Sequence, residues 1–320
     1  MRNMLIPLIV KGISKITEKN RLTVLTYHRV GESYNQLYMN EDLFEQQLIW
    51  LKKYFNPMGL DEALILQKSG DLPERAVVLT IDDGYEDCYT KIFPLLKKHH
   101  LTATFFISTS GLIRGLLWDE LISSSIMTLG IDITELNFDA KNYQLRTHNE
   151  RLSCAFCIIK GLKYRPLAER NGLIRQLIEK TGHKKEKYQF LNEEKIVTLY
   201  KAGMGIGAHT VNHPILVCED IENAKVEICE SKRILEKIIE NPVDYFAYPN
   251  GKKNIDFNLS HQKIVKECGF KAGFSTDWGS ISESDDFYSL NRFTPWDHNE
   301  IKFSLRLALN FNEKYTRFRK

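Results

Sequence analysis

The sequence predicts an α/β protein whose mostly parallel sheet is either open or closed into a barrel. Two apolar runs of strand length, residues 76–81 and 102–108, are each followed or preceded by segments with helical spacing. The chain has 320 residues, of which 43% are hydrophobic and 27% are charged. This balance is typical of a globular domain with a large core, so the fold does not require disulfides.

The expected elements alternate along the chain, and the first strand is expected to end near His28. Asp42 is expected to cap the first helix. The expected elements, in order, are the strand 21–30, the helix 42–55, the strand 76–81, the helix 94–100, the strand 102–108, the helix 193–203, the strand 204–209, the helix 222–240, the segment 245–251, the helix 261–269, the strand 270–276 and a last segment beginning at 289.

Residues 111–190 interrupt this alternation with helical patterns around a polar middle near 133–150. Since no repeat or low-complexity linker occurs, the simplest interpretation is one domain, residues 1–320, with a helical insertion at 111–190. Residues 1–20 predict an N-terminal helix that either covers the barrel or rests as a basic amphipathic segment on a membrane face. Its apolar core is too short to span a bilayer, which takes about 20 apolar residues.

Charge and cysteine usage limit the classes of function. The net charge is only +3 and no long basic block occurs, so no nucleic-acid partner is predicted. No small-residue cleavage site follows the N-terminal apolar stretch, so a cytoplasmic location with reduced thiols is expected, peripheral at the membrane if the N-terminal helix rests there. Cys154 and Cys157 form a CxxC pair without ligand partners nearby, and they are expected to be buried thiols in a helix.

Asp82 and Asp83 directly follow the apolar strand 76–81 and precede Gly84. At the carboxyl end of a parallel strand, side chains point into the crevice where ligands bind in α/β folds. Two adjacent carboxylates alternate in direction, so they can serve two different tasks. Asp-Asp-Gly is also a good turn sequence, so the pair alone does not define a site.

His209 and His213 also follow a short strand and lie four residues apart, so one turn would bring both to the same side. With a carboxylate they would form a three-ligand site for zinc or a similar divalent ion, with one open position. Such a metal would activate a water and polarise a carbonyl, and a second carboxylate could act as general base. This arrangement suits hydrolysis of an amide or ester. The chain has no Gly-rich loop for hydride or phosphoryl transfer.

These segments resemble the motifs of the polysaccharide deacetylase family, carbohydrate esterase family 4. LTIDDGYED is similar to the first motif and GAHTVNHP to the second. The resemblance implies an irregular (β/α) barrel with fewer than eight strands. It implies that Asp82 is the catalytic base, that Asp83, His209 and His213 bind the metal, and that Thr210 braces their loop. Zinc is the expected metal, and cobalt or nickel would also suit the site.

The third motif, YFAYPNG, departs from the family pattern of an Arg followed by Pro-Pro-Tyr-Gly. Ala247 stands where the family Arg would orient the base, so we expect Arg292 to take that task, with Arg29 as second candidate. Asn250 stands where a Tyr backbone N–H would help to stabilise the oxyanion, and a backbone donor survives that exchange. The residues expected to contact the substrate are Tyr248, Pro249, Asn250 and Trp278.

The histidine that protonates the leaving amine in the family is also missing, since LNRF replaces a Leu-x-His pattern. His28 and His298 are the candidate substitutes, and His28 is better placed because strand ends converge on the site in a barrel. A structural histidine beneath the site is the alternative for His28. Trp118, Trp278 and Trp296 could stack on a sugar or simply be packed.

The resemblance implies removal of an N-acyl group, most simply acetyl, from an amino-sugar glycan or its lipid-linked precursor. The Ala-Tyr-Pro-Asn-Gly version of the third motif is similar to that of members acting in exopolysaccharide or surface-glycan assembly. Deformylation or O-deacetylation by the same site, and an inactive glycan-binding relative, remain as alternatives. The insertion could cap the site, form a dimer contact or meet a lipid carrier.

Overall fold

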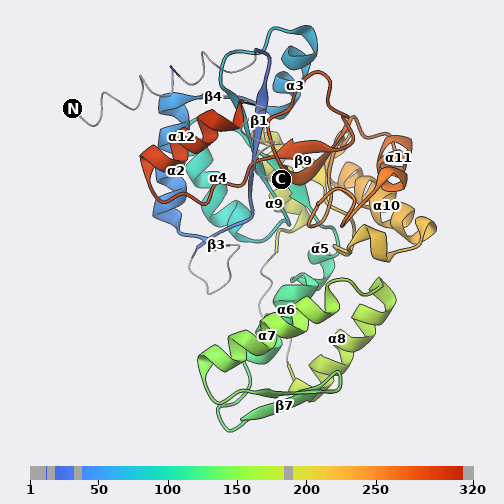
Figure 1. Cartoon of the computed structure of the whole chain (residues 1–320). Helices are drawn as coiled ribbons and strands as arrows, with labels where there is room; N and C mark the ends of the chain where they lie inside the picture. Colours follow the sequence, from blue (N-terminus) through green and yellow to red (C-terminus); the bar gives the residue numbers. More distant parts are fainter. Residues whose placement is uncertain (1–11, 13–18, 32–37, 184–189, 313–320) are drawn as a thin grey trace.

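The computed structural model describes residues 12, 19–31, 38–183 and 190–312, and its centre is a parallel sheet curved into a barrel (Figure 1). Around the wall the strands follow the order β1 (Leu22–Tyr27), β5 (Ala76–Ile81), β6 (Thr104–Ile107), β9 (Gly205–Ala208), β10 (Tyr245–Ala247), β11 (Ala272–Trp278) and β12 (Leu290–Arg292). Phe293, just after β12, bonds to the backbone of Val24 and Thr26 in β1, so the barrel is nearly closed. The predicted barrel with fewer than eight strands is confirmed.

Three short strands lie beside this wall. β4 (Asn56–Pro57) pairs with the first half of β5, whose second half pairs with β6. β2 (Arg29–Val30) and β3 (Tyr38–Met39) form a small pair of their own. The helices around the barrel are α2 (Glu41–Tyr54), α3 (Leu60–Ser69), α4 (Phe93–Lys98), α9 (Glu193–Lys201), α10 (Ile221–Ile239), α11 (Leu259–Glu267) and α12 (Glu300–Asn310), with the short helical turns η1 (Cys88–Ile92) and η2 (Leu216–Cys218).

Strand residues alternate between two apolar layers, as the period of two requires. In β1, Leu22 and Val24 belong to a layer that packs within the sheet and against α3. Leu25 and Tyr27 belong to the larger layer that packs against the surrounding helices. Because both faces are covered, all six residues of β1 and of β5 are buried. The helix predicted at 42–55 begins one residue earlier, since Asn40, not Asp42, accepts the capping hydrogen bonds.

The insertion forms a subdomain with its own core, seen below the barrel in Figure 1. It comprises α5 (Gly111–Arg114), α6 (Trp118–Met127), β7 (Glu135–Phe138), β8 (Lys141–Gln144), α7 (His148–Leu162) and α8 (Leu167–Thr181). The insertion contains helices, as expected, but its polar middle near 133–150 also forms the antiparallel hairpin of β7 and β8, which was not expected. Only Leu136 and Phe138 of β7 are buried, so the strand pattern is short and weak.

The cysteines differ from the expectation of six reduced thiols. Cys229 on α10 and Cys268 after α11 are joined as a disulfide, with their Cα atoms 5.4 Å apart. The other four are free. Cys154 is buried on α7 as predicted, whereas Cys157, expected to be buried, is exposed.

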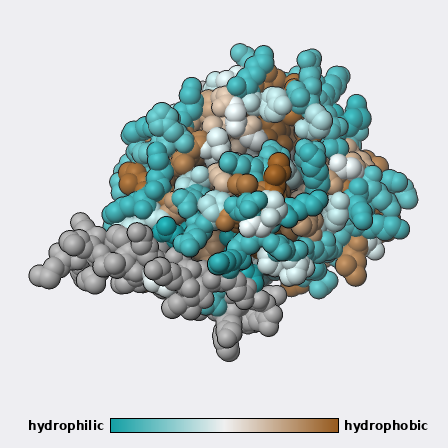
Figure 2. Space-filling model, turned by 90° about the horizontal axis from the view of Figure 1, so that it is seen from above, coloured by the Kyte–Doolittle hydropathy of each residue, from teal (hydrophilic) through white to brown (hydrophobic). Residues whose placement is uncertain are grey.

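The surface seen from above is mainly hydrophilic, with small hydrophobic groups scattered over it (Figure 2). No helix in the described part of the chain is long and apolar enough to cross a membrane. The N-terminal helix predicted for residues 1–20 lies almost wholly outside the described residues.

Candidate metal centre and active site

The Asp82–Gly84 turn lies at the carboxyl end of β5. The backbone N–H of Asp82 still bonds to the Tyr27 carbonyl, at 2.9 Å, so Asp82 continues the sheet. Asp83 and Gly84 then adopt left-handed conformations, with φ of 78° and 98°. A Cβ on Gly84 would lie 2.9 Å from Ile107 Cγ2, so both conformation and space require glycine there. The turn separates two buried carboxylates, which are 1% and 4% exposed.

The two histidines lie on the loop after β9, beside the end of β6. His209 N–H bonds to the Ile107 carbonyl at 3.1 Å. Thr210 and His213 both have left-handed backbones, with φ of 64° and 52°. The Thr210 hydroxyl donates to the His209 carbonyl and accepts from the His213 N–H, so it braces the loop. Non-glycine residues in this conformation are uncommon, and they persist where surrounding contacts over-determine them.

Asp83, His209 and His213 converge, with ligand atoms all within 4.8 Å of one another. Asp83 Oδ1 lies 3.6 Å from His209 Nε2 and 3.5 Å from His213 Nε2. These separations are too long for hydrogen bonds. Two atoms bonded tetrahedrally to one zinc at about 2.0–2.1 Å would lie about 3.4 Å apart. The spacing therefore suits three ligands of one ion.

The protonation of the two imidazoles also suits a metal. His209 Nδ1 lies 2.7 Å from the Ala247 carbonyl oxygen, which can only accept, so Nδ1 carries the hydrogen and Nε2 the lone pair. Burial lowers the pKa of His209 to about 4 and lowers that of His213 well below its usual value. Burial, together with the charge of Asp82, raises the pKa of Asp83. A divalent cation would reverse this last effect, because its charge favours the carboxylate.

Asp82 points to Arg292 at the end of β12. The guanidinium donates two parallel hydrogen bonds to the carboxylate, Nη1 to Oδ1 at 2.8 Å and Nη2 to Oδ2 at 2.7 Å. Arg292 Nε also donates to the Ser275 carbonyl, and the side chain is only 1% exposed. Burial raises the pKa of Asp82, but Arg292 and the nearby histidines outweigh it and lower the pKa to about 2. Asp82 is therefore an oriented, ionised carboxylate.

Arg29, the second candidate for this task, lies elsewhere. Its guanidinium pairs with Asp87 at 3.1 Å and with Glu120 at 3.2 Å. It also lies over the rings of Tyr38 and Tyr85. The structure therefore brings Arg292, and not Arg29, to Asp82.

Of the two candidate histidines, His28 is the one near Asp82. Its Nε2 lies 4.0 Å from Asp82 Oδ2, and its side chain is 21% exposed. Burial lowers the pKa of His28, against the opposing influence of Asp82. His298 is exposed on the loop before α12. His28 also lines a small recess with Trp296, which is 49% exposed.

The third motif differs from the sequence expectation at Tyr248. Its side chain is fully buried, its ring stacks on Phe257 at 3.7 Å, and its hydroxyl donates to the Tyr288 carbonyl. The prediction that this side chain lines the groove is wrong. β10 alternates, so Ala247 joins the layer inside the sheet and Tyr248 joins the layer facing the helices.

Pro249 is buried as well, and Asn250 is half-buried with φ of 58°. The Asn250 carbonyl accepts from the Thr276 hydroxyl. Among the residues that the structure describes, the Asn250 N–H has no acceptor, so the donor expected for an oxyanion is available.

The tryptophans have different surroundings. Trp278 stacks on Phe293 at 5.1 Å and lies under the Arg306 guanidinium, which are the contacts of a packed residue. Trp118 is 8% exposed and packs on Arg170. Only Trp296, of these three, combines an exposed ring with a position beside His28.

Two supporting residues were not expected from the sequence. Glu227 on α10 accepts from the N–H groups of Val211 and Asn212 and from the Asn212 side chain. Ser108 donates its hydroxyl to the His209 carbonyl, and its N–H bonds to the Asp83 carbonyl at 3.0 Å. The sequence signal for Glu227 is its position on the buried face of an amphipathic helix, where a carboxylate needs partners.

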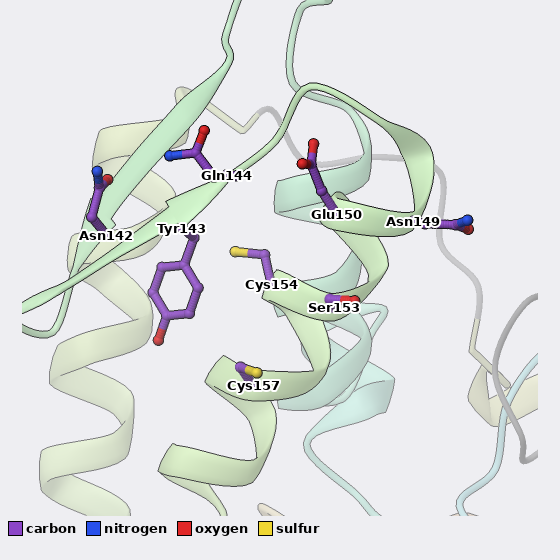
Figure 3. Close-up of a pocket in the computed structure, with 8 residues that line it drawn as sticks. All are labelled: Asn142, Tyr143, Gln144, Asn149, Glu150, Ser153, Cys154 and Cys157. Atoms are coloured by element: carbon purple, nitrogen blue, oxygen red, sulfur yellow. The ribbon is translucent and has the colours of Figure 1, made fainter.

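A separate pocket lies in the inserted subdomain, between β8 and α7 (Figure 3). Its lining residues are Asn142, Tyr143, Gln144, Asn149, Glu150, Ser153, Cys154 and Cys157. None of them belongs to the centre formed by Asp82, Asp83, His209 and His213, so this pocket is distinct from the candidate active site.

The fold and the geometry define a parallel barrel with a candidate metal site beside an ionised carboxylate, at the carboxyl ends of its strands. The chain belongs to the polysaccharide deacetylase family: the family model described as "Polysaccharide deacetylase" matches residues 69–124 and 166–273, just over half of the chain. The unmatched residues between these segments lie within the inserted subdomain. Family membership makes the chain a deacetylase-type hydrolase.

Curated relatives agree with this assignment. YxkH of Bacillus subtilis, a protein named for the same family, is 23% identical over 279 residues, which cover 86% of this chain and 72% of the relative. A poly-beta-1,6-N-acetyl-D-glucosamine N-deacetylase of Staphylococcus aureus strain MSSA476 is 26% identical over 217 residues, covering 59% of this chain and 72% of the relative.

Among solved structures, the Streptococcus pyogenes deacetylase PplD in complex with acetate has a TM-score of 0.61 at 20% identity. That comparison covers 90% of this chain and 98% of the other. IcaB from Ammonifex degensii has a TM-score of 0.58 at 19% identity, covering 90% and 97% of the two chains. These likenesses show that the fold is shared.

Proposed function

We propose that this chain is a metal-dependent hydrolase that removes an N-acyl group, most simply acetyl, from an amino-sugar glycan or its lipid-linked precursor. The observation that carries the proposal is the convergence of Asp83, His209 and His213 beside Asp82, whose carboxylate is held by Arg292. Three metal ligands and a separately oriented base are the components of metal-dependent amide hydrolysis.

Asp83, His209 and His213 would hold the ion, and zinc suits two imidazoles and one carboxylate, with cobalt or nickel as alternatives. When bound, the metal would activate the attacking water and polarise the carbonyl of the acyl group. The lowered pKa values leave a lone pair on each imidazole, and the fixed Nδ1–H of His209 places its lone pair on Nε2.

Asp82 would accept the proton of the attacking water, with Arg292 fixing its orientation. Because the pKa of Asp82 is lowered to about 2, the carboxylate is ionised at neutral pH and can accept a proton. His28, 4.0 Å away and neutral at rest, would take that proton and deliver it to the leaving amine. The N–H of Asn250 would donate to the developing oxyanion.

The substrate class is inferred from the relatives. The named activity of the Staphylococcus aureus protein is N-deacetylation of poly-beta-1,6-N-acetyl-D-glucosamine, an amino-sugar polymer. Because this chain belongs to the polysaccharide deacetylase family and carries the candidate ligand set, we infer that it acts on a similar glycan. Trp296 offers an open ring beside His28 for a sugar, and Trp278 remains a weaker candidate because it is packed. A cytoplasmic location, peripheral at the membrane if residues 1–20 rest on a membrane face instead of covering the barrel, is proposed on the sequence alone.

The first test removes the metal. Chelation is expected to lower acyl release from N-acetylglucosamine oligomers or a lipid-linked amino sugar by at least about 100-fold, and zinc, cobalt or nickel is expected to restore it. Acetate and formate are quantified separately, and an O-acetylated glycan is included, so the released group identifies the reaction. Stoichiometric metal binding without acyl release from any substrate would contradict the proposal and favour a glycan-binding relative.

His28→Ala is expected to lower kcat on the order of 100-fold, because proton delivery to the leaving amine is lost. Added imidazole is expected to restore part of the rate, which a merely structural histidine would not allow. The matched control is His298→Ala, which removes an exposed imidazole and is expected to leave kcat within about twofold of the wild type. Equal rates for His28→Ala and the wild type would show that another group delivers the proton.

A further inference from the structure

The inserted subdomain reaches the metal-ligand loop through Arg170 on α8. Arg170 Nη1 donates to the carbonyl oxygen of His213 at 3.1 Å, and Nη2 donates to that of Asn212 at 2.8 Å. The side chain is only 1% exposed, and its guanidinium lies 4.5 Å from the centre of the Trp118 ring on α6. Two helices of the insertion therefore hold one guanidinium against the loop.

A residue of the opposite charge, on a helix of the barrel, holds the same loop from the other side of its backbone hydrogen-bonding groups. Glu227 on α10 accepts from the N–H groups of Val211 and Asn212, at 3.0 Å and 2.7 Å. The peptide groups of this segment thus lie between a buried guanidinium and a buried carboxylate. Charge-assisted hydrogen bonds of this kind are stronger than neutral ones.

His213 depends on these backbone contacts more than His209 does. The ring of His209 is oriented by its own hydrogen bond from Nδ1 to the Ala247 carbonyl. The Nδ1 of His213 is buried and has no partner among the described residues. Its ring orientation therefore follows from its backbone, which is left-handed and is contacted by Thr210 and Arg170.

We propose that Arg170 is a positioning residue for the metal ligand His213, so that the inserted subdomain sets the geometry of the metal centre. This inference rests on the proposed metal-dependent function. Groups that orient ligands in this way typically contribute about 10–100-fold to metal affinity. The insertion thereby becomes part of the active centre rather than an independent attachment.

The docking of the insertion does not depend on Arg170 alone. The Tyr164 hydroxyl bonds to Asp256 at 3.0 Å, and the Leu167 N–H bonds to Glu219 at 2.6 Å. A variant of Arg170 can therefore lose its effect on the loop while the subdomain stays in place.

The test compares Arg170→Met and Arg170→Lys with a matched control, Arg151→Met. Arg151 binds backbone carbonyls of Leu129, Gly130 and Leu145 inside the insertion and does not contact the ligand loop. Affinity for zinc is measured by competition with a chelating indicator, the cobalt-loaded protein is examined by visible absorption, and folding is checked by circular dichroism and thermal unfolding.

Arg170→Met is expected to lower zinc affinity by at least about 10-fold and to change the cobalt ligand-field bands, with Arg170→Lys in between. Arg151→Met is expected to keep both within about twofold of the wild type. Wild-type affinity in Arg170→Met, or an equal loss in Arg151→Met, would overturn the inference while leaving the proposed function intact. A wild-type protein that binds no divalent metal would overturn the proposed function, and the inference with it.

Discussion

Asp82→Asn is expected to lower kcat for acyl release by at least about 1,000-fold, the largest effect that we predict for a single substitution. An amide cannot accept the proton of the attacking water at neutral pH. The substitution also places an amide NH₂ against the guanidinium of Arg292, where both carboxylate oxygens now accept hydrogen bonds. Metal binding should persist, because Asp82 is not one of the three ligands.

The measurement is initial acetate release by metal-loaded protein, with metal content and thermal unfolding recorded for each variant. The control is Asp297→Asn, which weakens another Arg–Asp pair, with Arg306, outside the proposed machinery. That variant is expected to lose stability without a comparable loss of kcat. Retention of more than about a tenth of wild-type kcat in metal-loaded Asp82→Asn would contradict the role of Asp82 as base.

Arg292→Met is expected to lower the free energy of unfolding by about 3–5 kcal/mol at neutral pH, because it leaves the buried Asp82 carboxylate unpaired. The pair lies at 1% and 2% side-chain exposure, so solvent cannot replace the guanidinium. The activity should fall as well, since the burial that raises the pKa of Asp82 is then opposed mainly by the nearby histidines.

The sign of the pH dependence follows from the folded-state pKa of Asp82. In the wild type this pKa is about 2, below the usual 3.8, so the stabilisation is present above about pH 4 and is lost as the pH falls toward 2. In Arg292→Met the pKa of Asp82 is expected to rise. The stabilisation that comes from the lowered pKa of Asp82 is then lost. The base is then ionised only at higher pH, and the acidic limb of kcat/KM should move upward.

Denaturant unfolding and pH–rate profiles of the wild type, Arg292→Met and Arg292→Lys measure these effects. Arg292→Lys keeps the charge but not the two parallel hydrogen bonds, so an intermediate shift is expected. An unchanged acidic limb in Arg292→Met would show that Arg292 does not set the protonation of Asp82.

The barrel was predictable because its strands are locally distinctive. β5 has five apolar residues and one threonine, is followed directly by Asp-Asp-Gly, and all six of its residues are buried. The hairpin of β7 and β8 was missed, since it carries only two buried residues in β7 within a polar stretch. The cap of α2 was misplaced by two residues, because Asn40 and Asp42 are equally good capping residues in sequence.

The site was predictable where its residues are neighbours in the chain. Asp82 with Asp83, and His209 with His213, stand in short motifs at strand ends, and the structure brings them together. Tyr248 was wrongly expected to contact the substrate, because the motif in which it stands lines the groove in the family. The alternation of β10 instead turns its ring toward Phe257 in the core.

The sequence by itself therefore determined the alternating α/β fold, the family and the four central residues, since each depends on local pattern. Only the tertiary structure decided which distant groups support them. Arg292 meets Asp82 across 210 residues because β12 returns to β1, and Arg170 meets His213 across 43 residues because the insertion docks beside the loop. Such contacts depend on barrel closure and side-chain packing, which leave no periodic or local signal in the chain.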